Sequence, residues 1–143
     1  MKDIKEKIKY PLKAAVIDLR PGLLRALREV YPGIPVQACV IHLARQVDQR
    51  LPKLKRKRGS RANQKLRALI NELLFSNTIN EALSAYQEII RREGEFKGKR
   101  QKSVIRMVKR NLGLILAHHY HSNLPRDNNI TENIIKQLNK KLK

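Results

Sequence analysis

Short apolar runs and turn residues alternate in the first third of the chain. Residues 14–17 are four apolar residues that end at Asp18, and residues 34–40 are a second, mostly apolar segment after a Pro-Gly turn. Runs of this length between turn signals are typical of buried strands. Leucines at helical spacing separate the two runs, and another helical pattern follows the second. The order strand, helix, strand, helix predicts a parallel sheet with helices on its faces over residues 1–50.

Residues 51–122 carry helical patterns throughout. Apolar residues recur every three or four positions in three successive stretches, which predicts three amphipathic helices. Their inner faces are expected to contain Leu66, Leu69, Ile70, Leu73 and Leu74; then Ala82, Ala85, Tyr86, Ile89 and Ile90; then Val104, Ile105, Val108, Leu112, Ile115 and Leu116. Thr78 is expected to cap the second helix, and Glu81 would complete a capping box.

Residues 123–143 predict a polar turn and a last helix, with isoleucines and leucines on one face and lysines opposite. The chain has no internal repeat and no Gly/Ser-rich linker, so residues 1–143 are interpreted as a single domain. Its parts are the strand-helix-strand-helix core at 1–50, a basic helical segment at 51–122 and a C-terminal core helix at 123–143. The predicted fold class is α/β at the N-terminus with a predominantly α-helical remainder, mostly α overall.

The charge balance of the chain indicates what kind of partner it binds. Lys and Arg total 32 against 12 Asp and Glu, a formal net charge of +20, which suits a polyanionic partner. Nucleic acid fits better than a membrane, because no apolar run approaches the roughly 18 residues of a spanning helix. With no Trp, two Phe and four Tyr, the chain has few rings on which single-stranded bases could stack. The one cysteine cannot form an internal disulfide, and we expect a cytoplasmic protein.

A basic segment is the strongest signal for binding. Its cations are Lys53, Lys55, Arg56, Lys57, Arg58 and Arg61. No acidic residue occurs between Asp48 and Glu72, and further cations such as Arg67 and Arg106 follow. Charge of this kind predicts sequence-independent contacts to the phosphate backbone of double-stranded DNA. A non-catalytic basic helical protein that binds DNA or RNA is the alternative.

Two carboxylates and a Cys-x-x-His element are the candidates for chemistry. Asp18 follows the first strand, where functional groups collect in open α/β sheets, although a turn or helix cap would use the same residue. Glu132 lies in the first turn of the last helix, where it would complement the helix dipole. Cys39 and His42 could bind zinc only with further ligands, such as the histidines at 118–121. A buried thiol beside a turn-orienting histidine, and a Cys–His nucleophile, remain open readings of that element.

These elements together resemble the transposases of the Mutator-like group and the related prokaryotic insertion-sequence transposases. The specific part is the block Gln37-Ala38-Cys39-Val40-Ile41-His42 after Asp18, preceded by Tyr31-Pro32. The family's final segment is matched by Asn129-Ile130-Thr131-Glu132 at the start of the last helix. The resemblance covers roughly residues 13–142.

The resemblance implies an RNase H-like fold of the DDE type, in which three carboxylates hold two divalent ions, Mg²⁺ or Mn²⁺, for strand transfer on DNA phosphodiesters. Asp18 would be the second carboxylate and Glu132 the third, both catalytic and metal-binding. Cys39, His42 and Asn129 would support the active site. Residues 51–122 would be the family's insertion, with its basic loop along DNA.

One part of the family pattern is not matched. The family's first Asp lies on an earlier strand, but only 17 residues precede Asp18, and Asp3 lies in a charged, helix-like segment. We therefore expect a truncated transposase of a prokaryotic mobile element, nucleoid-associated and inactive by itself. A homodimer partner or a separate N-terminal part would complete it, and an open sheet edge would favour such pairing.

Overall fold

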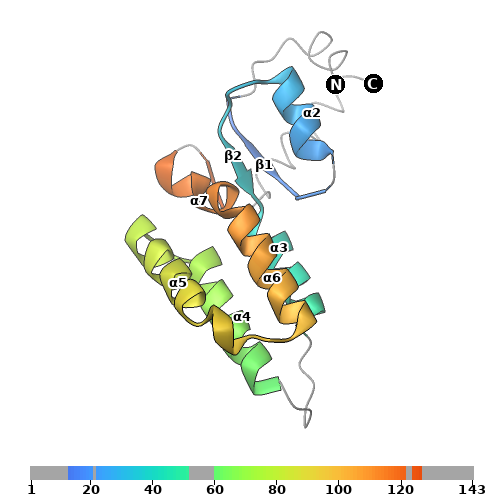
Figure 1. Ribbon diagram of the computed structural model, residues 1–143. Helices are drawn as coiled ribbons and strands as arrows, with labels where there is room; N and C mark the ends of the chain where they lie inside the picture. Colours follow the sequence, from blue (N-terminus) through green and yellow to red (C-terminus); the bar gives the residue numbers. More distant parts are fainter. Residues whose placement is uncertain (1–12, 21, 52–59, 122–123, 127–143) are drawn as a thin grey trace.

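The computed structural model describes residues 13–20, 22–51, 60–121 and 124–126 of the chain. The elements, in chain order, are β1 (Ala15–Ile17), α2 (Leu23–Val30), β2 (Val36–Ala38), α3 (Val40–Arg50), α4 (Ser60–Leu74), α5 (Ile79–Arg91), η1 (Glu93–Glu95), α6 (Lys99–Arg110) and α7 (Leu112–Tyr120). The prediction of a mostly helical chain with a small α/β start is confirmed. In Figure 1, the sheet and α2 form one end of the molecule and α4, α5 and α6 the other.

The two strands pair in parallel, as predicted. Ala15 is paired with Val36, and Ile17 with Ala38. Parallel strands need a crossover connection, which α2 supplies. Gly22 precedes that helix with a φ of 84°, a left-handed conformation that glycine adopts without a Cβ clash. One face of the sheet packs against Leu27 and the partly buried leucines of α2, and the opposite face is left for α7 and the segment that follows it.

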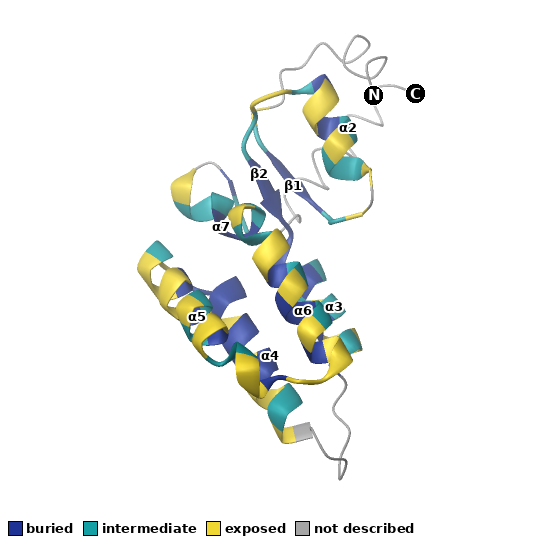
Figure 2. Ribbon diagram, in the orientation of Figure 1, coloured by how far each residue is buried: buried dark blue, intermediate teal, exposed yellow. Residues whose placement is uncertain are grey.

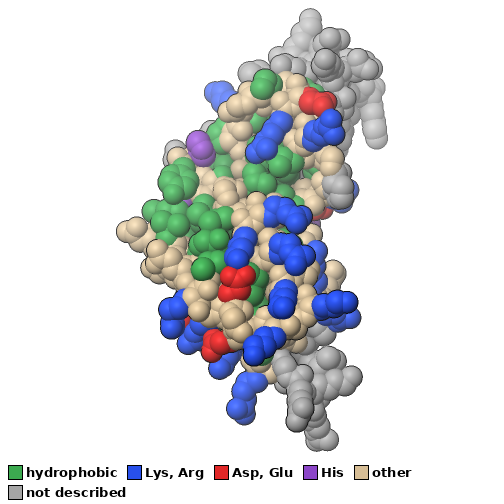
Figure 3. Space-filling view, in the orientation of Figure 1, with side chains coloured by type: hydrophobic (Ala, Val, Ile, Leu, Met, Phe, Trp, Pro, Cys, Tyr) green, Lys and Arg blue, Asp and Glu red, His purple; other side chains and the backbone are tan. Residues whose placement is uncertain are grey.

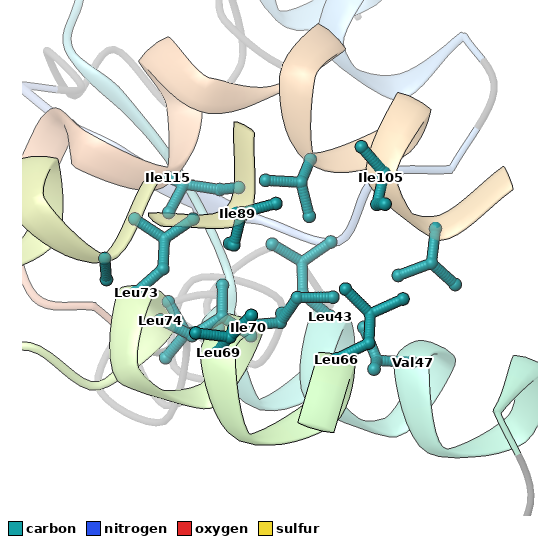
Figure 4. Close-up of a cluster of buried hydrophobic side chains, with 14 of the residues drawn as sticks. Leu43, Val47, Leu66, Leu69, Ile70, Leu73, Leu74, Ile89, Ile105 and Ile115 are labelled. Carbon is teal, nitrogen blue, oxygen red and sulfur yellow. The ribbon is translucent and has the colours of Figure 1, made fainter. Parts of the chain in front are cut away.

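The main core lies among α3, α4, α5, α6 and α7, each of which contributes buried residues to it (Figure 2). Figure 4 shows leucine, isoleucine and valine side chains of these helices meeting in one cluster. The predicted inner face of α4 is confirmed, since all five of its residues are buried. The predicted inner face of α5 is partly wrong: Ala82, Ala85 and Ile89 are buried, but Ile90 is 37% exposed. No helix among the described residues is long and apolar enough to cross a membrane.

The third predicted helix is two helices in the structure. α6 ends at Arg110 and α7 begins at Leu112, so the chain bends at Asn111. The Asn111 side-chain amide donates to the carbonyl oxygen of Met107 at 2.9 Å. The Asn111 N–H donates to the same oxygen at 3.1 Å, so the Met107 carbonyl accepts two bonds from the residue at which α6 ends.

The cap of α5 is confirmed with one difference. The Glu81 N–H donates to Thr78 Oγ1 at 3.1 Å, as predicted. The Glu81 carboxylate, however, accepts from the N–H of Asn77 at 3.1 Å, one residue before the cap. Both free N–H groups are still satisfied at the start of the helix. The last predicted helix, over 130–142, lies outside the described residues.

Candidate active site at the carboxyl end of the sheet

Asp18 lies directly after β1, at the carboxyl end of the sheet. The Cys39 N–H donates to the carbonyl oxygen of Ile17 at 2.8 Å, so the ends of the two strands are adjacent. The Asp18 carboxylate keeps 22% of its side-chain surface exposed and accepts from Arg20 Nε at 2.9 Å. A carboxylate so placed has oxygen lone pairs that face the solvent, and Arg20 balances its charge.

Cys39 and His42 occupy different surroundings. Cys39 is 1% exposed and packs against Val16 and Leu124, so it is a buried thiol, one of the readings that the sequence allowed. His42 stands in the first turn of α3, and its Nδ1 is buried without a hydrogen-bond partner among the described residues. A buried thiol between apolar side chains is inert unless the site opens, which argues against Cys–His nucleophilic chemistry.

Gln37 holds the sheet to α7, and its role was not predicted from the sequence. Its side chain is fully buried, and its Nε2 donates to the carbonyl oxygens of Ala38 at 2.9 Å and Ile115 at 2.8 Å. Its Oε1 accepts from the backbone N–H of His118 at 2.7 Å and lies 3.1 Å from His118 Nδ1. The amide orientation follows from these partners, since the nitrogen meets two carbonyls and the oxygen meets donors. One polar residue inside an apolar strand was the available signal, because a buried amide must find partners.

The neighbouring histidines on α7, His118 and His119, are partly buried. Burial lowers the pKa of His118, and the nearby His119 lowers it further; burial also lowers the pKa of His119, against a smaller opposite effect of Glu81. His119 Nε2 lies 3.3 Å from Ser76 Oγ. Both pKa values therefore lie below the ordinary histidine value near 6.5, and both side chains are mainly neutral at pH 7.

The zinc interpretation has no geometric support. Among the residues that the structure describes, which include Cys39, His42 and the histidines of α7, no three side chains of His, Cys, Asp or Glu are grouped so that they could hold a metal ion. A structural zinc site requires about four ligands in a tetrahedral array. Asp18 therefore needs ligands from elsewhere if it binds a metal.

The segment after α7 returns to the carboxyl end of the sheet. The Val40 N–H donates to the carbonyl oxygen of Arg126 at 3.0 Å, and Leu124 is buried against Val16 and Cys39. The Arg126 guanidinium lies over the ring of Phe75 at 5.7 Å. Asn129 and Glu132 follow three and six residues later in the sequence and lie outside the described residues.

The predicted DNA-binding residues are only partly described. Lys53, Lys55, Arg56, Lys57 and Arg58 lie outside the described residues, whereas Arg61 is exposed in the first turn of α4.

The suggestion that Arg67 adds to a phosphate-binding surface is wrong. Arg67 is only 7% exposed, and its Nη1 donates to the carbonyl oxygen of Leu51 at 3.0 Å. Leu51 caps the carboxyl end of α3, and a cation at that end of a helix complements both the free carbonyls and the dipole. Arg67 therefore stabilises the junction of α3 and α4.

A hollow of about 630 Å³ lies between α4 and α5, away from the sheet. Glu72, Glu81 and Glu88 are among its lining residues, and none of the lining residues comes from the strands. Three carboxylates would repel a phosphate, so this hollow is a poor site for a nucleic acid.

One of three comparisons with known proteins found a match. The family model described as Transposase, Mutator family, matches residues 1–143. Neither a search of curated proteins nor a search of solved structures found a match. The resemblance carried by Asp18, the block at 37–42 and Glu132 is confirmed at the level of the family: the chain belongs to the Mutator family of transposases.

Proposed function

We propose that this transposase uses Asp18 and Glu132 as two carboxylates of a DDE-type site that binds Mg²⁺ or Mn²⁺ and acts on DNA. The observation that carries the proposal is the hydrogen bond from the Val40 N–H to the Arg126 carbonyl oxygen. It ties the chain just before Glu132 to the strand end next to Asp18. Six residues separate Arg126 from Glu132, and six residues span at most about 20 Å when extended. Glu132 is thus within reach of Asp18.

The chemistry of the donors fits the proposed ions. Carboxylate oxygens are hard ligands, and Mg²⁺ takes one or two of them while keeping several waters. Asp18 is partly exposed and has Arg20 as its ion-pair partner. A divalent ion bound to the Asp18 carboxylate would take the place of the Arg20 guanidinium. When bound, two such ions would activate the attacking oxygen and stabilise the leaving oxygen of a phosphodiester. Cys39 contributes by packing: its contacts with Val16 and Leu124 hold the segment after α7 against the sheet.

The proposed organisation follows from the core. Ala38, Val40, Leu43 and Val47, from the first 50 residues, pack in one cluster with α4, α5, α6 and α7. This continuity supports a single domain in which 51–122 is a helical insertion and 1–50 and 123–143 form a partial RNase H-like core. The basic segment Lys53–Arg58 and Arg61 would contact the DNA backbone beside that core.

Binding of Mn²⁺ tests the carboxylate pair without requiring strand transfer. Asp18→Asn and Glu132→Gln each remove one charged ligand, and each is expected to lower the Mn²⁺ affinity measured by electron paramagnetic resonance at least about tenfold. Asp48→Asn, an exposed acid on α3, is the matched control and should bind Mn²⁺ like the wild type. Circular dichroism establishes that each variant is folded.

Wild-type Mn²⁺ affinity in Asp18→Asn would refute the metal site. If only Asp18→Asn lost affinity, the pairing with Glu132 would be wrong. A chain that binds DNA but no Mn²⁺ in any form would favour the alternative, a non-catalytic basic helical protein that binds DNA or RNA.

A further inference from the structure

Helix α6 turns a basic face to the solvent. Its buried side is formed by Gln101, Val104, Ile105 and Val108, which join α6 to the main core. The exposed basic residues of the helix are Lys99, Arg100, Lys102, Arg106, Lys109 and Arg110. α6 contains no acidic residue. In the face drawn in Figure 3, Lys and Arg side chains gather over this helix.

Most of these cations have no acidic partner. Lys109 Nζ is 2.6 Å from Glu93 Oε1, but none of the other five makes an ion pair with any residue in the described ranges. The cations at the end of α5 behave differently, because Arg91 and Arg92 both contact Glu88. Unbalanced positive charge therefore distinguishes α6 from the basic end of α5.

The surroundings of α6 extend the positive surface. Arg50 of α3 reaches across to Ser103 Oγ at 3.3 Å, which places another guanidinium beside the helix. A hollow of about 360 Å³ lies along α6 and is lined by Lys102, Arg106 and Lys109, with Glu93 as its one acid. Glu93 pairs with Lys109, so Lys102 and Arg106 are the two cations of this hollow that are available to a single phosphate group.

The spacing of the cations suits one strand of a duplex. Along α6, Lys99, Lys102, Arg106 and Arg110 follow one another at intervals of three or four residues, so they lie on one face. Like charges at such intervals destabilise an isolated helix. The twelve residues of α6 extend over about 18 Å at 1.5 Å per residue. A DNA strand carries one phosphate per roughly 3.4 Å of axis, so about five phosphates lie along that length.

We propose that the outer face of α6 is a docking surface for the phosphate backbone of double-stranded DNA. This inference rests on the proposed function, which makes DNA the partner, and it assigns the contact to α6 in addition to the basic segment before α4. A duplex fits better than a single strand, because α6 has no aromatic side chain and the nearby Phe96 is 2% exposed.

The test measures DNA binding by the full chain with a labelled duplex in fluorescence anisotropy at several salt concentrations. Glutamine keeps the helical propensity while removing the charge. The test variant carries Lys99→Gln, Lys102→Gln, Arg106→Gln and Arg110→Gln. We expect its affinity at 0.1 M salt to fall about 100-fold or more, and the slope of log K against log salt to become shallower by about 3.6, since each of the four lost phosphate contacts removes about 0.9.

A second variant controls for the change in total charge. It removes four exposed cations from other elements: Arg25→Gln, Arg28→Gln, Lys65→Gln and Arg91→Gln. Its affinity should fall less than about tenfold, with a slope change below about 1. Equal losses in the two variants would overturn the assignment to α6, because they would show an effect of net charge alone.

The remaining outcomes separate this inference from the proposed function. If the α6 variant binds the duplex as the wild type does, the docking surface is refuted while the proposed function stands. If the wild-type chain does not bind the duplex, DNA as partner falls together with the surface. Tighter wild-type binding to a single strand or to duplex RNA of the same length would refute the preference for duplex DNA.

Discussion

Replacing Gln37 with leucine would remove the polar link between β2 and α7 while keeping the side chain nearly the same size. The change removes three hydrogen bonds of the Gln37 amide, those to the Ala38 and Ile115 carbonyl oxygens and the one from the His118 N–H. Ile115 and His118 lie within α7 and keep their helical partners, so each lost bond costs about 1 kcal/mol and the three cost about 3 kcal/mol. Burying a leucine in place of an amide returns about 1.5 kcal/mol. The free energy of unfolding should therefore fall by about 1.5 kcal/mol, which corresponds to about 3–6 °C in Tm for a chain of this length.

Urea unfolding followed by far-ultraviolet circular dichroism measures this change, because α7 and the other helices dominate the signal. Gln87→Leu is the matched control: Gln87 is exposed on α5, and its replacement should change the free energy of unfolding by less than about 0.5 kcal/mol. Gln37→Glu keeps one acceptor but sets a carboxylate against the carbonyl oxygens of Ala38 and Ile115, so it should be at least as unstable as Gln37→Leu. A Gln37→Leu protein as stable as the wild type would refute the structural role of the amide.

Two further predictions concern the helices. Because burial lowers the pKa of His118 and His119 below the unfolded value near 6.5, the unfolded chain takes up protons first, and stability should be full above pH 6.5 and fall as the pH drops below it. His118→Asn, whose amide can replace the Nδ1–H donor, should make thermal unfolding between pH 7 and 5 less pH-dependent, and an unchanged slope would contradict this. Thr78→Ala removes the hydroxyl that accepts from Glu81 and should lower the free energy of unfolding in urea by about 1 kcal/mol, whereas an exposed Ser84→Ala on the same helix should not.

The elements that the sequence predicted well are those in which one periodicity decides the structure. The leucines of α4 repeat at helical spacing and are all buried, and the two apolar runs before residue 41 pair as strands. The break at Asn111 was missed because apolar residues keep their spacing across it. At the break the Asn111 side chain and its N–H both donate to the Met107 carbonyl oxygen, a local arrangement that hydrophobic spacing does not reveal.

Tertiary contacts account for the parts of the site that the sequence could not place. In the sequence Arg67 looks like one more exposed cation. It is buried because the carboxyl end of α3 lies beside it. Asp18 could be located at a strand end, but its ion pair with Arg20 depends on the turn between them. The partners of Gln37 are about 80 residues away in the chain, so only the fold brings them together.

The junction between β2 and α3 has a mechanical consequence. Cys39 alone separates the strand from the helix, and its backbone is bonded to Ile17, so the junction has no length in which to bend. α3 packs against α6, and its eleven residues extend about 16 Å from the sheet edge. α3 therefore fixes the distance and the rotation between α6 and the carboxyl end of the sheet, where Asp18 lies. One inserted residue would turn everything beyond it by about 100° and shift it by 1.5 Å, so the length of α3 should tolerate change far less than its surface does.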